Sequence, residues 1–126
     1  MGFLHNNAAD AVNARNRLIK ETHIERIINF ADLCFQLFEG AVRPAALIIF
    51  RKRLDIEATY CFEYWVPEAD SNLKIRRLIT LRSTDKMSLA SVRVISDPLV
   101  FKRQLWMNEP ESKLFSYVCA FGLCAI

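Results

Sequence analysis

Residues 45–50 read AALIIF, and three cations, RKR, follow at once at 51–53. A continuous apolar run of this length with an abrupt charged end is typical of a strand that is covered on both faces and then emerges into water. Upstream, the run IERIINF at 24–30 is rich in isoleucine and predicts another strand. The first half of the chain is therefore expected to contain two strands.

A helix is expected before these strands. Residues 8–21, AADAVNARNRLIKE, place Val12, Leu18 and Ile19 near one helical stripe. Asn7 stands where a helix needs a capping side chain. The pattern predicts a helix over 8–21.

The second half of the chain has alternating and helical patterns. Alternation over 58–66, ATYCFEYWV, puts Tyr60, Phe62 and Tyr64 on one face and predicts a strand that Pro67 ends. The other predicted elements are a helix over 71–81 capped by Asp70 or Ser71, a strand over 88–95, a helix over 98–107 opened by Asp97 and Pro98, and a helix from Glu109 toward Gly122. Local alternation over 73–77 also allows a strand in place of the first of these helices. The element order predicts a mixed α/β fold.

Composition suits a packed domain and excludes one class of site. The chain has 126 residues, of which 52% are hydrophobic and 25% are charged. This length is enough for one domain with its own core. The three glycines, at 2, 40 and 122, are too far apart to form a loop whose backbone amides lie against a phosphate or an adenosyl group. The sequence therefore contains no nucleotide-binding loop of this kind.

The cysteines and the first residues indicate the compartment. The four cysteines, at 34, 61, 119 and 124, form no Cys-x-x-Cys pair and stand at no ligand spacing from the two histidines. We expect reduced, mostly buried thiols and no metal site. The start of the chain lacks the regions of a signal peptide, and the uncharged stretch 117–126 is too short to span a bilayer. A cytoplasmic protein without a membrane segment is expected.

Positive charge is concentrated in one part of the chain. The net charge is +3, but residues 72–106 contain eight cations and only two anions. Such a surface attracts phosphate backbones, and Phe101 or Trp106 would add stacking. The alternative is a solvated helix face with the aromatic side chains in the core.

Three longer stretches match a known pattern. They read ERIINFADLCFQLFEGAVRPAALIIFRK at 25–52, CFEYWVPEADSNLKIRRLITL at 61–81 and DPLVFKRQLWMNEPESKLF at 97–115. They resemble the late part of the catalytic domain of adenine-N6-specific DNA methyltransferases, the N-6 DNA methylases of restriction-modification systems. The resemblance covers about residues 14–117 and is most specific at LFEGAVRPAALIIF and DPLVFKRQLWM.

The resemblance implies a partial Rossmann-like methyltransferase sheet. Segments 8–21, 24–30 and 43–51 would be the last helix and the final antiparallel strand pair of that sheet. The resemblance thus divides the chain into a catalytic-domain portion, 1–53, and a basic α+β extension toward a DNA-recognition region, 54–126. Family enzymes bind S-adenosylmethionine through a glycine-bearing loop and hold the target amine with an Asn-Pro-Pro-aromatic loop. This sequence has no Gly-x-Gly and no Pro-Pro pair, so the active centre is expected upstream of Met1 and no cofactor is expected to bind this chain alone.

One catalytic-domain feature is expected within the chain. Methyltransferases flip the target adenine out of the duplex and hold it against aromatic side chains. By its position in LFEGAVRPAALIIF, Phe38 matches the stacking aromatic that related enzymes carry just before the last sheet strand, and Phe35 is the second candidate. The alternative is that Phe38 packs as core at the end of the sheet. The expected DNA-contacting cations are Arg43, Lys74, Arg76, Arg77, Arg82, Lys102 and Arg103.

Three interpretations follow for function. In the first, the chain is a fragment of a DNA adenine-N6 methyltransferase that is inactive alone and docks to an upstream methyltransferase half or subunit, or associates with itself. In the second, it is a non-catalytic module that binds nucleic acid or a partner. The third is a gene relic without function.

Overall fold

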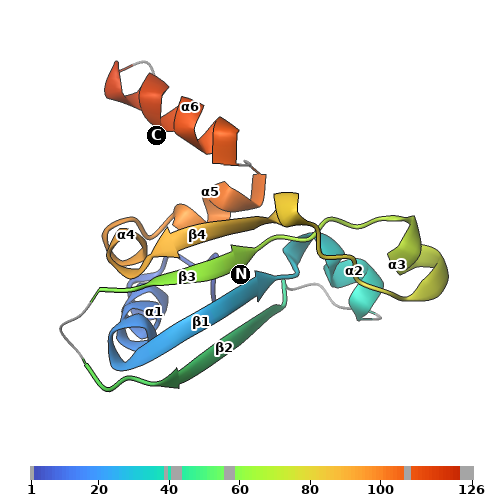
Figure 1. The fold of residues 1–126 in the computed structure, drawn as a ribbon, viewed down its shortest axis with the longest axis horizontal. Helices are drawn as coiled ribbons and strands as arrows, with labels where there is room; N and C mark the ends of the chain where they lie inside the picture. Colours follow the sequence, from blue (N-terminus) through green and yellow to red (C-terminus); the bar gives the residue numbers. More distant parts are fainter. Residues whose placement is uncertain (1, 39, 41–43, 56–58, 107–108, 123–126) are drawn as a thin grey trace.

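The computed structural model describes residues 2–38, 40, 44–55, 59–106 and 109–122. These residues form an α/β fold around one mixed four-stranded sheet with the strand order β2-β1-β3-β4 (Figure 1). The strands are β1 (Thr22–Asn29), β2 (Ala46–Lys52), β3 (Cys61–Trp65) and β4 (Lys86–Ala90). The helices packed on one face are α1 (Ala9–Glu21), α4 (Ser91–Ser96) and α5 (Val100–Trp106). The remaining elements are η1 (Ala31–Leu33), α2 (Cys34–Leu37), α3 (Ser71–Arg76), η2 (Ser83–Asp85) and α6 (Glu109–Ala120).

The strand register combines both directions of pairing. β1 pairs antiparallel with β2, from Thr22 opposite Lys52 to Asn29 opposite Ala46, and a bulge interrupts the register between Ile24 and Arg26. β1 pairs parallel with β3, and β3 pairs antiparallel with β4. The strands before residue 53, β1 and β2, therefore belong to the same sheet as the strands after it, β3 and β4.

The core lies between this sheet and the helices on its covered face. Ile24, Ile27, Phe62, Tyr64 and Leu89 point inward from three strands and are almost fully buried. The helices contribute Ile19, Val94, Val100 and Phe101 to the same cluster. The alternation of apolar residues in 58–66 therefore predicted the inward face of β3 correctly.

A buried hydrogen-bond chain crosses this core. The Asn29 side-chain Nδ2 donates to Nε2 of His5 and to the hydroxyl of Tyr64, both at 2.8 Å. The Tyr64 hydroxyl in turn donates to the backbone oxygen of Phe101 at 3.1 Å. Burial, together with the positive charges of Lys102 and Arg15, lowers the pKa of His5. The neutral imidazole is thus the form that accepts the Asn29 proton.

Arg15 ties the first residues to the helical layer. Its side chain is buried, and Nη1 donates to the backbone oxygens of Phe3, at 2.7 Å, and Asn6. Nη2 donates to the oxygen of Pro98 at 3.3 Å. A buried charge needs hydrogen-bond partners of this kind. Through these bonds Arg15 connects α1 to the N-terminal segment and to the residues just before α5.

The structure confirms several predicted elements. The helix predicted over 8–21 is α1, the strand over 24–30 is β1, the strand over 58–66 is β3, and the helix that begins at Glu109 is α6. The predicted cap at Asn7 is wrong, because the N-cap residue of α1 is Ala8 and no side chain caps the helix. The helix predicted over 98–107 begins two residues later, at Val100, and Asp97 accepts from the amide of Leu99 at 3.2 Å.

Four predictions are wrong in part. The strand β2 is present, but its residues are mostly exposed because it lies at the sheet edge and not between two covered faces. The helix over 71–81 stops at Arg76, because Arg77 adopts a left-handed conformation with φ of 58°. The strand over 88–95 ends at Ala90, and α4 replaces its second half. Among the cysteines, Cys61 is exposed and Cys119 half-buried, so these two thiols are not core residues.

Candidate nucleic-acid interface

The segments that follow β1 and β3 meet at one end of the sheet. The two strands run parallel, so their carboxyl ends lie at the same edge, where α/β proteins commonly bind ligands. The Asp32 carboxylate accepts from the amide of Ala69 at 3.0 Å, and Arg77 Nη1 donates to the backbone oxygen of Gln36 at 3.3 Å. Figure 1 shows α2 and α3 side by side at this end. We call this part of the surface, residues 31–38 and 68–82, the α2–α3 end.

Phe38 belongs to the α2–α3 end. It follows α2 directly and is 53% exposed, so it is not a core residue. The backbone of Phe35 lies within α2, but its side chain lies outside the described residues. Between them, Oε1 of Gln36 is buried and has no hydrogen-bond partner among the described atoms. Sequence reasoning missed Gln36, because its burial comes from tertiary packing.

Asp70 holds α3 in place. Its Oδ1 caps the helix by accepting from the amide of Leu73 at 3.0 Å, as the sequence predicted for Asp70 or Ser71. Its Oδ2 accepts from Arg82 Nη2 at 3.1 Å, which joins the start of α3 to the start of η2. The bond to the Leu73 amide is the main reason why the pKa of Asp70 is lowered. Asp70 therefore positions the basic residues around it.

Four of the predicted DNA-contacting residues lie at the α2–α3 end. Lys74, Arg76, Arg77 and Arg82 are all exposed. Among the described residues, Lys74 and Arg76 form no ion pair, whereas Arg82 pairs with Asp70. The exposed apolar side chains of the same segment are Ile75, Leu78, Ile79 and Leu81. This end thus combines positive charge with apolar surface.

The other predicted contact residues do not join this cluster. Lys102 is exposed and Arg103 half-buried on α5, which lies away from α3 (Figure 1). Arg103 Nη1 pairs with Asp97 at 2.6 Å, so this cation is already engaged. Arg43 lies outside the described residues, as does the Trp106 side chain. Phe101 is buried in the core and cannot stack on a base, which corrects that expectation.

The sheet face opposite the helices carries a second polar cluster. Glu63 Oε2 accepts from Arg26 Nε at 2.8 Å and from the indole nitrogen of Trp65 at 3.1 Å. Lys86 Nζ lies 3.8 Å from the other Glu63 oxygen. Both cations approach the Trp65 ring, at 5.8 Å for Arg26 and 5.6 Å for Lys86. The hydrogen bond from Trp65 is the main cause of the lowered pKa of Glu63.

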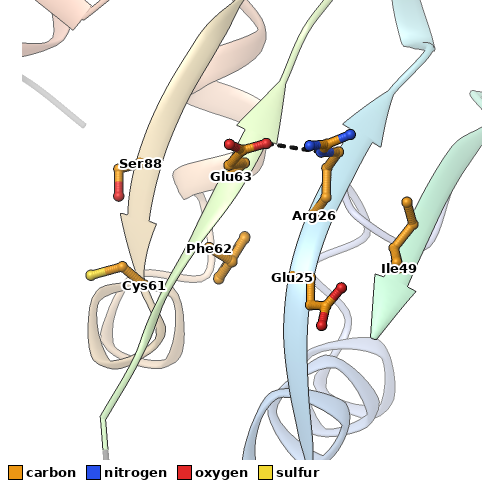
Figure 2. Close-up of a pocket in the computed structure, with 7 residues that line it drawn as sticks. All are labelled: Glu25, Arg26, Ile49, Cys61, Phe62, Glu63 and Ser88. Carbon is orange, nitrogen blue, oxygen red and sulfur yellow. Dashed lines mark hydrogen bonds and ion pairs between the residues drawn. The ribbon is translucent and has the colours of Figure 1, made fainter. Parts of the chain in front are cut away.

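Beside this cluster the open sheet face has a shallow depression of about 420 Å³. It is lined by Glu25, Arg26, Ile49, Cys61, Phe62, Glu63 and Ser88. Figure 2 shows the Glu63 and Arg26 side chains directed toward each other across neighbouring strands. Within the described ranges, no group of three or more His, Cys, Asp or Glu side chains is arranged to hold a metal ion. Glu25, Arg26, Glu63 and Ser88 make the lining of the depression largely polar.

Comparison of the chain with protein-family models, curated proteins and solved structures found no match. No helix in the described part of the chain has the length and apolar character needed to cross a membrane.

Proposed function

We propose that the chain supplies the late part of the catalytic domain of a DNA adenine-N6 methyltransferase. In this proposal it acts together with an upstream part that carries the S-adenosylmethionine loop and the Asn-Pro-Pro-aromatic motif. The sheet would then be the end of a Rossmann-like sheet, with α1 as its last helix and β1–β2 as its final antiparallel pair. The chain alone would transfer no methyl group.

The observation that carries this proposal is the outer edge of β2. No described strand pairs with this edge, and β2 exposes Leu47, Ile49 and Phe50. An apolar strand with an unpaired backbone favours the addition of another strand. A preceding sheet half would add that strand and bury these side chains.

The position of Phe38 supports the same proposal. Its exposed ring stands at the carboxyl end of β1, in the segment that leads into the edge strand β2. An adenine turned out of a duplex needs such a surface for stacking, and stacking contributes about 1–3 kcal/mol per base. Phe38 would form one wall of a pocket that the upstream part completes.

The first test is to read the coding DNA upstream of Met1. A reading frame with both motifs, in frame or adjacent, is expected. The upstream product and this chain are then produced together, and transfer of labelled methyl groups to DNA is measured. Phe38→Ala should lower the rate about 5- to 150-fold, which corresponds to the stacking energy above. Phe3→Ala, an exposed phenylalanine at the far N-terminal segment, is the matched control.

One outcome would overturn the methyltransferase proposal: an upstream region in which neither motif is encoded. An active pair in which Phe38→Ala and Phe3→Ala methylate DNA at the same rate would overturn only the stacking role of Phe38 and would leave the methyltransferase proposal standing.

A second candidate function is nucleic-acid binding without catalysis. The observation that favours it is the cluster of exposed Lys74, Arg76 and Arg77 on and after α3. Binding to duplex DNA should weaken steeply as salt is added, because each phosphate contact releases a counterion. Lys74→Gln combined with Arg76→Gln should lower the slope of log affinity against log salt by about two. Arg93→Gln, an exposed cation on α4, is the control.

A further inference from the structure

Residues 2–6 fold back onto the core, and we call this segment the N-terminal latch. Within it, the backbone amides of His5 and Asn6 both donate to the oxygen of Gly2 at 3.0 Å. Leu4 and His5 are almost fully buried. Leu4 also lines a narrow apolar gap, whose other walls come from α1, the sheet and α5 and include Leu18, Ile19, Ile24, Ile48 and Phe101. Removal of the latch would therefore expose apolar side chains of the core.

Polar contacts hold the latch in addition to the burial of Leu4. Arg15 on α1 donates to the backbone oxygens of Phe3 and Asn6. Nε2 of His5 accepts from Nδ2 of Asn29 on β1 at 2.8 Å. An arginine keeps its charge at every ordinary pH, whereas free histidine titrates at about pH 6.5. The His5 contact is therefore the one of these that depends on pH near neutrality.

The direction of the His5 hydrogen bond is fixed by backbone groups. The Asn29 side chain cannot turn around, because its Oδ1 accepts from the backbone amide of Ala31 at 3.1 Å. Its Nδ2 also donates to the Tyr64 hydroxyl, whose own proton goes to the backbone oxygen of Phe101. Nδ2 of Asn29 therefore directs a proton at His5, and Nε2 of His5 must accept it with its lone pair.

Protonation of His5 would put two N–H donors against each other. An imidazolium carries a proton on both ring nitrogens, so the bond from Asn29 is lost. The charged groups that act on His5 are Arg15 on α1 and Lys102 on α5, and both are positive. The groups from the sheet are the amide of Asn29 and, behind it, the hydroxyl of Tyr64, which burial keeps neutral. None of these groups offsets a positive charge on His5.

We propose that the N-terminal latch is released at mildly acidic pH, when His5 takes up a proton, and that its release exposes the apolar surface between α1, the sheet and α5. In the released segment water solvates the imidazolium, which the buried site does not. Below about pH 6.5, each pH unit should favour the released state by up to about tenfold. The remaining core still joins α1, α4 and α5 to three strands, so the domain stays folded.

This device is independent of the methyltransferase proposal. It uses neither Phe38 nor the outer edge of β2. Failure of the latch experiment would therefore leave the methyltransferase proposal intact, and the absence of upstream motifs would leave the latch intact.

The test is hydrogen exchange of the full chain at pH 8 and pH 5, followed residue by residue by NMR. The amides of His5 and Asn6, which donate to Gly2 within the latch, report its opening. After correction for the intrinsic pH dependence of exchange, their opening equilibrium should rise by up to about 30-fold from pH 8 to pH 5. Amides in β1 should stay far more strongly protected, and the far-UV circular dichroism should stay native.

Variants separate His5 from the groups around it. His5→Gln keeps an acceptor that does not titrate, so its latch should open equally at both pH values. Asn29→Asp places a carboxylate against His5, so its latch should stay closed at pH 5; if this buried change prevents folding, Lys102→Glu, at an exposed position, should shift opening to lower pH. His23→Gln changes the other histidine of the chain, which stacks on Tyr60, and should open like the wild type.

Three results would overturn the latch proposal. One is a wild-type latch whose opening equilibrium changes less than twofold between the two pH values. Another is an equal rise in His5→Gln and in the wild type. The third is exchange of the latch and of β1 through the same opening at pH 5, because protonation would then unfold the whole domain.

Discussion

Tyr64→Phe removes a single oxygen atom from the centre of the core. The Tyr64 side chain has no exposed surface, and its hydroxyl links Asn29 on β1 to the backbone oxygen of Phe101 on α5. Burial raises the pKa of Tyr64, so the hydroxyl stays neutral and can donate and accept at any ordinary pH. The ring itself fills the same space in the variant, so packing is preserved.

The expected loss of stability follows from the two broken bonds. Nδ2 of Asn29 loses one of its two acceptors, and the Phe101 oxygen loses a donor. A buried polar group left without its partner costs about 1–3 kcal/mol. We expect the free energy of unfolding to fall by about 2 kcal/mol. For a chain of this size the melting temperature should fall by about 8 °C.

Urea titration followed by circular dichroism measures this change. The midpoint should move to lower urea while the slope of the transition stays constant, since the exposed surface on unfolding is unchanged. Tyr117→Phe, the same chemical change on the exposed face of α6, should stay within about 0.5 kcal/mol of the wild type. A loss below about 0.5 kcal/mol for Tyr64→Phe would refute the buried hydrogen-bond chain.

Three more predictions concern charged and capping groups. The lowered pKa of His5 means that the imidazole binds a proton more readily in the unfolded chain than in the folded one. The free energy of unfolding should therefore decrease as the pH falls below about 6.5. His5→Gln should make this decrease smaller when unfolding is measured at pH 8 and at pH 5. Trp65→Phe removes the hydrogen bond that contributes most to the lowered pKa of Glu63. The pKa of the Glu63 carboxyl should therefore rise toward its usual value in a carbon-13 NMR titration, and an unchanged pKa would contradict the contact. Asp70→Ala removes the cap on Leu73 and should lower the free energy of unfolding by about 0.5–2 kcal/mol, whereas Asp70→Asn should keep most of it, as measured in urea.

Local patterns predicted the elements that depend on neighbouring residues. The stripe of α1, the alternation in β3 and the cap at Asp70 are properties of short segments, and the structure has all three. The run AALIIF also predicted a strand at the right place. What the run could not indicate is whether anything lies beside it, and in the structure β2 is an exposed edge.

The candidate site was predictable only in part. Phe38 and the cations around α3, which the sequence singled out, are exposed in the structure. The sequence could not predict that the cations form two separate groups. Lys102 and Arg103 belong to the same basic stretch of sequence as Lys74 and Arg76, but they lie on α5 and not on α3. Arg103 is ion-paired with Asp97, six residues away along the chain.

The sequence by itself determined the α/β class, most helix and strand positions and the absence of a glycine-rich cofactor loop, because each depends on residue type and local spacing. Tertiary structure alone decided the parallel contact of β1 with β3, the burial of His5, Asn29 and Tyr64 in one hydrogen-bond chain, and the uncovered sheet face. These features join residues that lie 24 to 37 positions apart in the chain. Pairing over such distances is selected by the packing of the whole core, and no local pattern encodes it.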